Sequence, residues 1–164
     1  MKNGIIIRNA KKEDVRQIAE ICVEDWKKAY RGIFDSDFLN SRSVDKQYEM
    51  EIKRYQEFVV AADGNRVLGY AWLKTMEDET ADCEIVALYV RYADRNHGTG
   101  KRLLRYAVSY FKEIGKKSMI IWCLKDNYEA RGFYEKTGGK EFQSGSHNWG
   151  GKEYEMISYL YDLG

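Results

Sequence analysis

The sequence predicts an α/β protein in which helices cover a mixed β-sheet. Three observations lead to this fold class. Strand-like and helix-like apolar patterns alternate along the chain without an intervening linker. The first half contains two strand-like runs joined by a tight turn, which favours antiparallel pairing. The second half contains a strand–helix–strand unit over residues 83–124, which favours two parallel neighbouring strands and a right-handed crossover.

The amino-terminal half predicts one strand, two helices and a hairpin. Residues 5–7 form the first strand, and a helix with one apolar face follows over residues 15–30. The more polar segment 35–54 predicts a second, weaker helix. Strands are expected at 58–62 and 67–73, because Gly64 and Asn65 between them tolerate the positive φ of a hairpin turn.

The carboxy-terminal half predicts two strand–helix units and a hairpin. The strand 83–90 precedes a helix over 101–114, which Gly115 ends. The apolar face of that helix consists of Leu103, Leu104, Ala107, Val108, Phe111 and Ile114. An apolar run at 119–124 is typical of a central strand that is covered on both faces. A short helix at 127–136 and a hairpin over 140–162, turning near 149–151, complete the chain.

Composition excludes several classes of function. The 164 residues suffice for one domain, and the net charge of +1 gives no general basis for binding nucleic acid or a membrane. The three cysteines, Cys22, Cys83 and Cys123, are widely spaced and odd in number, which favours a reducing compartment over a disulfide framework. We therefore expect a cytoplasmic protein. Neither the cysteines nor the two histidines have metal-ligand spacing, so no metal is expected.

A turn with two glycines is the most informative segment. It lies between the strand 83–90 and the helix 101–114 and reads Arg95-Asn96-His97-Gly98-Thr99-Gly100. Such a turn directs backbone N–H groups to a phosphate or pyrophosphate at the positive end of a helix. The glycines have no Cβ to block the anion, and Arg95 adds a charge-assisted hydrogen bond.

Two familiar phosphate loops do not fit this turn. The nucleoside-triphosphate loop needs a glycine where Arg95 stands, and a Ser or Thr where Arg102 follows Lys101. The dinucleotide fingerprint needs a third glycine at the position of Leu103. A solvated glycine-rich connection without a ligand remains the alternative.

Three segments together resemble the GCN5-related N-acetyltransferase (GNAT) family. They are residues 84–90, which are similar to the family's fourth strand, the Arg-x-x-Gly-x-Gly turn, and residues 127–138, which are similar to its Asn-x-x-Ala-x-x-Phe-Tyr segment. Residues 26–32 more loosely resemble the bacterial small-molecule branch, which includes polyamine acetyltransferases. The chain departs from the pattern at Gly139-Lys140, where Gly-Phe is common, and Phe142 is expected to take over that packing.

The resemblance implies one N-acetyltransferase domain over residues 1–164. Its sheet would have six or seven mostly antiparallel strands with a splayed parallel pair, and about four helices would cover it. The cosubstrate would be acetyl-coenzyme A. The implied cofactor-binding residues are Leu88, Tyr89, Val90, Arg95, Asn96, His97, Gly98, Thr99, Gly100, Lys101, Asn127 and Tyr134. The backbone of the first three would pair with the pantetheine arm as an added strand does, and the turn would hold the pyrophosphate.

The chemistry needs two proton transfers. An alkyl amine with a pKa of about 10.4 must lose a proton before it can attack, and Glu84 stands where the family often places its base. The coenzyme thiolate must gain one, and Tyr134, a phenol with a pKa of about 10, matches the family's usual acid. The alternatives are a solvated strand-edge carboxylate for Glu84 and a core tyrosine beside Phe133 for Tyr134. A covalent route through Cys83 or Cys123 lacks a nearby histidine.

The acceptor is predicted to be a small primary amine, such as a polyamine, an amino acid or an aminoglycoside-like compound. Aromatic and acidic side chains suit a cationic amine; the candidates are Trp26, Tyr30, Asp35 and Trp72, with Asp37, Tyr70, His147 and Trp149 as further lining residues. For Trp26, which lies on an apolar helix face, a core role is favoured. An acetyl-coenzyme A sensor without turnover, a protein acetyltransferase, a nucleotide-phosphate binder and a homodimeric assembly all stay open.

Overall fold

The computed structural model describes residues 4–164, so residues 1–3 of the expected domain lie outside the described residues. The chain divides into two compact units. The first unit extends to Leu73 and resumes over Ala87–Tyr106, and the second comprises Lys74–Val86 and Ala107–Gly164.

The strands form a seven-stranded mixed sheet in the order β1-β2-β3-β4-β5-β7-β6. Their bounds are β1 Ile5–Asn9, β2 Phe58–Asp63, β3 Arg66–Thr75, β4 Cys83–Val90, β5 Ser118–Leu124, β6 Lys140–Trp149 and β7 Lys152–Asp162. Strands β4 and β5 are parallel, whereas the pairs β1/β2, β2/β3, β5/β7 and β6/β7 are antiparallel. The predicted fold class is thus confirmed.

The described residues contain five α-helices, one more than the sequence led us to expect. They are α1 Val15–Ala29, α2 Ser36–Ser41, α3 Val44–Glu51, α4 Thr99–Glu113 and α5 Tyr128–Lys136. The single weak helix expected over 35–54 is wrong, because Arg42 and Ser43 are extended and divide it into α2 and α3. The Ser43 side chain then begins α3 by accepting a hydrogen bond of 3.2 Å from the Lys46 N–H.

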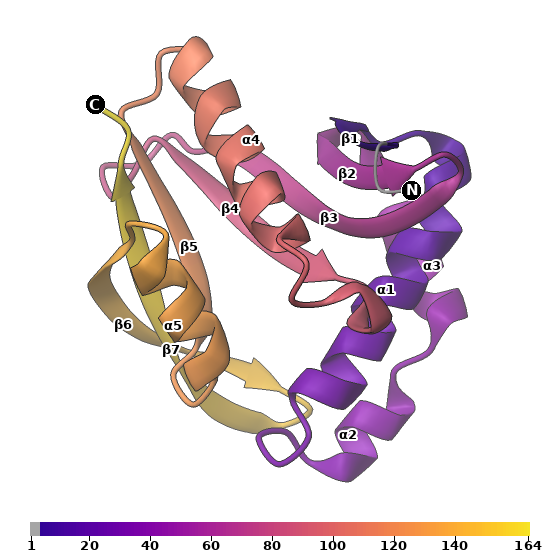
Figure 1. Ribbon diagram of the computed structural model, residues 1–164. Coiled ribbons are helices and arrows are strands. Elements are labelled where there is room, and N and C mark those ends of the chain that lie inside the picture. The colour runs from indigo at the N-terminus through magenta and orange to yellow at the C-terminus, as the bar shows by residue number, and fades with distance from the viewer. Residues whose placement is uncertain (1–3) are drawn as a thin grey trace. The chain divides into compact units, whose positions relative to one another are not determined.

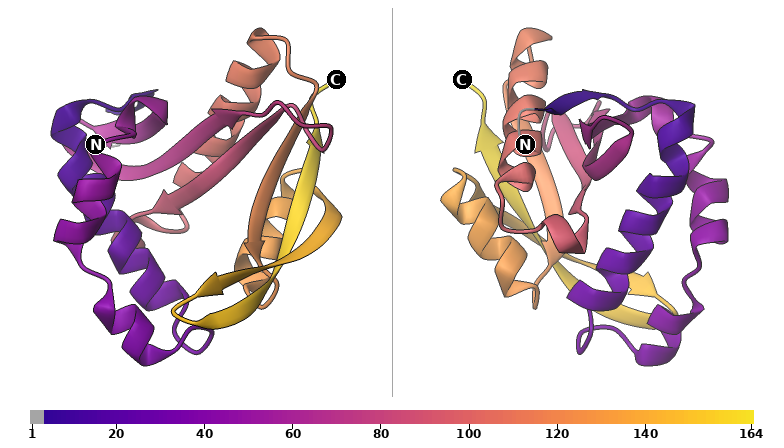
Figure 2. Two further views of the ribbon diagram at one scale, coloured as in Figure 1. Left: turned by 180° about the vertical axis from the view of Figure 1, so that it is seen from behind. Right: turned by 45° about the vertical axis from the view of Figure 1, so that its right-hand side comes forward.

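In the first unit, α1 and the start of α4 cover opposite faces of β3 (Figures 1 and 2). The Tyr70 hydroxyl shares a hydrogen bond with the Cys22 thiol of α1. The preceding residue, Gly69, faces the other way, and a Cβ there would lie 3.3 Å from the Leu103 side chain of α4. Burial on both faces explains why β3 is apolar at nearly every position from Val67 to Leu73.

In the second unit, α5 packs on β7, which pairs with β5 on one side and with β6 on the other (Figure 1). The Tyr134 ring of α5 lies 5.7 Å from the Tyr159 ring of β7. Residues Met119, Ile120 and Ile121 of β5 are all buried, as the continuous apolar run predicted. The hairpin of β6 and β7 extends as a long twisted ribbon, visible in yellow in Figure 2.

Two packing predictions in the second unit are wrong. Ile114 is 44% exposed because it follows the last residue of α4, where the helical period no longer directs its side chain inward. Phe142 is 43% exposed and does not replace the missing aromatic of the Gly-Phe pattern. It lies at the irregularity between Glu141 and Ser144, where the register of β6 with β7 shifts.

No helix within residues 4–164 combines the length and the apolar content that crossing a membrane would require.

Gly69 allows a close approach of β4 to β3 within the first unit. A Cβ on Gly69 would lie 2.8 Å from the Tyr89 carbonyl oxygen and 3.2 Å from the Cα of Val90.

Gly69→Ala therefore has to displace backbone, and we expect it to lower the free energy of unfolding by roughly 1–3 kcal/mol in denaturant titrations. The matched control is Gly132→Ala in α5, where a Cβ meets no atom within 4 Å. That variant should be stabilised by roughly 0.5–1 kcal/mol, and equal effects of the two substitutions would contradict this account.

Candidate active site

The turn after β4 has the backbone geometry of an anion-binding loop. A short 3-10 helix at Tyr92–Asp94 follows β4, and α4 begins at Thr99. Between them, Asn96 has a φ of 66° and Gly98 a φ of 84°. A left-handed conformation is uncommon for a residue with a side chain, so Asn96 marks a backbone that the surrounding contacts hold in place.

The first N–H groups of α4 precede its first intrahelical hydrogen bond. That bond joins the Arg102 N–H to the Gly98 carbonyl oxygen at 3.0 Å. The N–H groups of Thr99, Gly100 and Lys101 therefore lie at the positive end of the helix dipole. His97 and Lys101 are exposed beside them, and no atom lies within 4 Å of a Cβ built on Gly98. This arrangement suits a phosphate group.

Arg95 makes an ion pair that the sequence did not reveal. Its Nη2 lies 2.7 Å from Oδ1 of Asp25 in α1, and the two side chains are 26% and 5% exposed. The guanidinium carbon is also 5.3 Å from the centre of the Tyr92 ring. Arg95 thus ties the turn to α1, and its predicted role as a countercharge to pyrophosphate stays a prediction.

The end of β4 is fixed through the side chain of Tyr89. The Trp26 indole N–H donates to the Tyr89 hydroxyl at 3.0 Å, and the Tyr70 ring lies edge-on at 5.7 Å from the Tyr89 ring. Burial raises the pKa of Tyr89 well above its usual value. Leu88 and Val90 flank this anchored residue, so the backbone of the predicted pantetheine-binding segment is held on the α1 side.

Tyr134 in the second unit is buried and held by its neighbours. Its ring packs edge-on against Phe133 at 5.6 Å. Its carbonyl oxygen accepts hydrogen bonds from the Gly139 N–H at 2.9 Å and from the Tyr161 hydroxyl at 3.1 Å. Burial raises the pKa of Tyr161 to about 12, so this hydroxyl stays protonated and keeps donating at neutral pH. The end of α5 that carries Tyr134 is therefore rigidly placed.

A polar network beside Tyr134 was missed by the sequence reasoning. The Tyr159 hydroxyl accepts from Arg131 at 3.0 Å and donates to Glu135 at 2.8 Å. Arg131 also pairs with Glu141 of β6 at 2.7 Å. The spacing of Arg131 and Glu135 by four residues was a weak signal of a shared helix face. Nothing in the sequence indicated that Tyr159 would join them.

Glu84 occupies β4 within the second unit. It lies opposite Ile120 in the parallel ladder with β5, which covers three residues of β4 from Cys83 to Ile85. Its side chain is half-buried. Burial raises the pKa of Glu84 above its usual value and Asp78 adds to the increase, whereas Lys74 opposes it. A carboxyl group with a raised pKa is a typical general base.

Asn127 has a local structural role. Its side-chain oxygen accepts a hydrogen bond of 3.2 Å from the Ala130 N–H and so caps α5. The predicted hydrogen bond to the pantetheine arm stays a prediction.

Of the predicted acceptor residues, His147 and Trp149 lie in β6 of the second unit, and the others lie in the first unit, where their surroundings differ. Trp26 is buried, stacks on Phe34 at 5.1 Å and carries the Arg42 guanidinium 4.2 Å from its ring centre, so a core role is favoured. Tyr30 packs edge-on against Trp26 at 5.0 Å and is half-buried. Asp35 is exposed and precedes α2. Trp72 donates to Glu57 at 3.1 Å.

The cysteines do not have the environment of a nucleophile. All three are buried free thiols. Burial raises the pKa of Cys83 to about 12 and that of Cys123 to about 11, which disfavours the thiolate at neutral pH. Within the part of the chain that the structure describes, no group of three or more His, Cys, Asp or Glu residues is arranged to hold a metal ion.

Comparisons with known proteins agree on one family. A model of the acetyltransferase (GNAT) family matches residues 16–139. The N-acetyltransferase YuaI of Bacillus subtilis is 30% identical over 128 residues, which are 75% of this chain and 73% of YuaI. Spermidine N(1)-acetyltransferase of Thermoplasma acidophilum is 28% identical over 162 residues, which are 93% of this chain and 99% of that enzyme.

A solved structure has the same fold. The crystal structure of PaiA N-acetyltransferase from Thermoplasma acidophilum, determined in complex with coenzyme A, superposes with a TM-score of 0.76 at 24% identity. The match covers 96% of this chain and 98% of that one.

The raised pKa of Glu84 predicts a cost to stability at neutral pH. A carboxyl whose pKa is higher in the folded than in the unfolded state favours folding only at low pH, and this contribution is lost as the pH rises through the folded-state pKa. Glu84→Gln should therefore be more stable than the unaltered protein at pH 7–8, and the difference should shrink towards pH 4. Denaturant titrations across this range test it, with Glu153→Gln, an exposed carboxylate of β7, as the control for removing one negative charge. A stability gain for Glu84→Gln that does not change with pH would contradict this assignment.

Proposed function

The chain belongs to the acetyltransferase (GNAT) family, and we propose that it transfers the acetyl group of acetyl-coenzyme A to the primary amine of a small molecule. The observation that carries this proposal is the turn between β4 and α4. Its left-handed residues, Asn96 and Gly98, lead into helix N–H groups that suit a pyrophosphate. The coenzyme A complex of the PaiA relative supports the same cosubstrate.

The residues of the first unit fit a coenzyme A-type ligand. Acetyl-coenzyme A supplies an acetyl group that its thioester activates. The backbone N–H groups from Asn96 to Lys101 would hold the pyrophosphate, and the exposed Lys101 would add positive charge beside them. The backbone of Leu88, Tyr89 and Val90 would align the pantetheine amides. Asn127 would bind that arm through polar atoms other than the side-chain oxygen that accepts the hydrogen bond from the Ala130 N–H.

Glu84 is proposed as the group that takes the proton from the amine, directly or through water. Its carboxyl group is half-buried, and its pKa is raised. The pKa therefore lies closer to neutral pH than that of a solvated glutamate. Glu84→Gln should lose turnover, and part of the loss should be recovered at high pH, where more of the amine is already unprotonated. The same substitution that stabilises the fold at neutral pH would thus lower activity.

Tyr134 is proposed as the acid that protonates the coenzyme thiolate. A phenol is protonated at neutral pH and can therefore donate. Its position is fixed by the ring contacts with Phe133 and Tyr159 and by hydrogen bonds to its carbonyl oxygen. A fixed hydroxyl loses little entropy when it meets the reacting sulfur.

The proposed acceptors are polyamines, amino acids and aminoglycoside-like amines. The similarity to a spermidine acetyltransferase supports a polyamine. Two tryptophan faces of the first unit already carry arginines of the chain, Arg42 on Trp26 and Arg54 on Trp72, each 4.2 Å from the ring centre. Tyr30 and Asp35 are also proposed to contact a cationic acceptor, because an aromatic ring and a carboxylate both attract a cation. A homodimer and a cytoplasmic location stay predictions.

Titration with acetyl-coenzyme A, followed by an assay of free thiol release against a panel of amines, tests the function. Binding with amine-dependent thiol release is expected. Thermal stabilisation by acetyl-coenzyme A without thiol release from any small amine or peptide would favour a sensor. Release only with peptides would favour a protein acetyltransferase, and stabilisation by ATP alone would exclude the family's activity.

Tyr134→Phe tests the proposed acid. Removing the hydroxyl should lower kcat by roughly 10- to 100-fold and leave the affinity for coenzyme A nearly unchanged, because the ring and its packing are kept. The control is Tyr159→Phe, which loses the hydrogen bonds with Arg131 and Glu135. This variant should have a lower free energy of unfolding, and its kcat should fall less than that of Tyr134→Phe. Unchanged turnover of Tyr134→Phe while chemistry limits the rate would reject the assignment.

A further inference from the structure

Helix α1 supplies polar partners to the segment that connects β4 with α4. The Gln17 side-chain oxygen accepts from Arg91 at 3.2 Å, and Oε1 of Glu24 accepts from the Tyr92 N–H at 3.2 Å. Asp25 accepts from Arg95 at 2.7 Å. These contacts occur in the same order on the helix and on the connecting segment, so α1 and the segment run alongside each other within the first unit (Figure 1).

The last of these contacts is the strongest. Asp25 is 4% exposed, and a carboxylate this buried is costly unless a charged partner compensates it. Arg95 is its partner, with the short donor–acceptor distance typical of a charge-assisted hydrogen bond. The next residue along the chain is Asn96, whose φ of 66° starts the turn towards α4. Fixing Arg95 therefore fixes the chain immediately before the left-handed residue.

We propose that Asp25 is a positioning residue for the pyrophosphate of the cosubstrate, acting through Arg95 on the turn that leads into α4. This inference rests on the proposed function, because it assumes that the turn binds coenzyme A. Asp25 does not contact the ligand in this account. It holds Arg95 so that the N–H groups from Asn96 onward keep the directions that an anion needs.

A direct role of Arg95 predicts the opposite result. If the Arg95 guanidinium itself bound phosphate, Asp25 would compete with the ligand for it. Asp25→Asn would then release the guanidinium and strengthen coenzyme A binding. If Asp25 positions the turn, the same substitution weakens binding, because Arg95 loses its charged partner and the backbone beside Asn96 loses its constraint. The sign of the change distinguishes the two roles.

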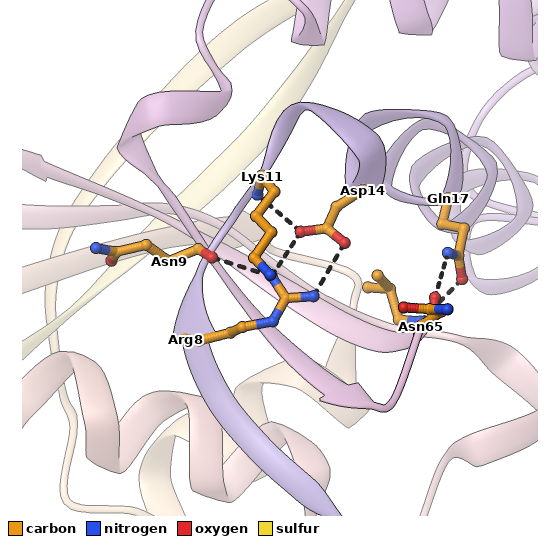
Figure 3. Close-up of polar contacts among 7 residues, drawn as sticks. Arg8, Asn9, Lys11, Asp14, Gln17 and Asn65 are labelled. Atoms are coloured by element: carbon orange, nitrogen blue, oxygen red, sulfur yellow. Dashed lines mark hydrogen bonds and ion pairs between the residues drawn. The ribbon is translucent and has the colours of Figure 1, made fainter.

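The chain offers a matched control in the same unit. Arg8 and Asp14 form a second ion pair with a nearly buried carboxylate, also at 2.7 Å, with side chains that are 21% and 6% exposed (Figure 3). Asp14 also accepts from the Lys11 N–H at 2.7 Å. This pair joins β1 to the segment before α1 and lies outside the turn. Asp14→Asn therefore reports the general cost of losing a buried aspartate charge.

The experiment measures coenzyme A affinity by calorimetry and steady-state kinetics with acetyl-coenzyme A and with acetyl-pantetheine, which lacks the pyrophosphate. Asp25→Asn should weaken coenzyme A binding and raise the KM for acetyl-coenzyme A by about tenfold. Its kcat at saturation and its kcat/KM for acetyl-pantetheine should stay within about twofold of the unaltered protein. Asp14→Asn should lower the melting temperature and leave both KM values within about twofold.

Further variants keep the proposal falsifiable. The double variant Asp25→Asn/Arg95→Gln should bind coenzyme A no more weakly than the weaker single variant, because the two residues act as one pair. If Asp25→Asn does not fold, Asp25→Glu is the alternative. It keeps the charge, but its side chain is one methylene longer and displaces Arg95. It should weaken coenzyme A binding by less than the factor expected for Asp25→Asn.

Three results would overturn the inference. Tighter or unchanged coenzyme A binding in the Asp25 variants would reject the positioning role while the proposed function stands. An equal rise in the KM for acetyl-coenzyme A in Asp14→Asn would show that the effect of Asp25→Asn arises from general destabilisation. Failure of the unaltered protein to bind coenzyme A at all would instead remove the proposed function, and the inference with it.

Discussion

The turn between β4 and α4 depends on polar contacts that reach it from α1. Two left-handed residues, Asn96 and Gly98, are needed to reverse the chain and expose the first helix N–H groups. A positive φ is uncommon for a residue with a side chain, so we expect partners elsewhere in the first unit to help hold Asn96. The buried carboxylate of Asp25 and the indole of Trp26 provide them, one through Arg95 and the other through Tyr89. Adjacent residues of one helix thus fix both the proposed phosphate turn and the strand before it.

The second unit places its proposed catalytic groups by a different physical means. Tyr134 is held by packing and by hydrogen bonds to its carbonyl oxygen. Beside it, Tyr159 bridges Arg131 and Glu135 and so joins α5 to β7. Glu84 is held in a short parallel ladder, and partial burial makes its charged form less favourable than in water. The partial burial of Glu84 therefore costs stability at neutral pH, as is common for groups at functional sites.

Most elements could be predicted because their signals are local. The apolar stripe of α1, the continuous apolar run of β5 and the Gly64–Asn65 turn each depend on a few neighbouring residues. Predictions were wrong where local signals were weak or ended. The polar segment 35–54 did not reveal the extended residues Arg42 and Ser43, and the periodicity of α4 does not extend to Ile114. Phe142 is exposed because a register shift, which has no sequence signature, re-aims that part of β6.

The sequence alone determined the glycine turn after β4, the helix that follows it and the residue types available for the proposed proton transfers, because glycine spacing and side-chain chemistry act over a few positions. The tertiary structure decided which of these residues have partners. Arg95 was expected to face an anion, which stays a prediction, and the structure pairs it with Asp25, 70 positions earlier in α1. Trp26 is buried and stacks on Phe34, in agreement with the core role that its apolar helix face favoured, and its contact with an acceptor stays a prediction. Pairings over such distances follow from the packing of helices on strands, which no short segment of the sequence encodes.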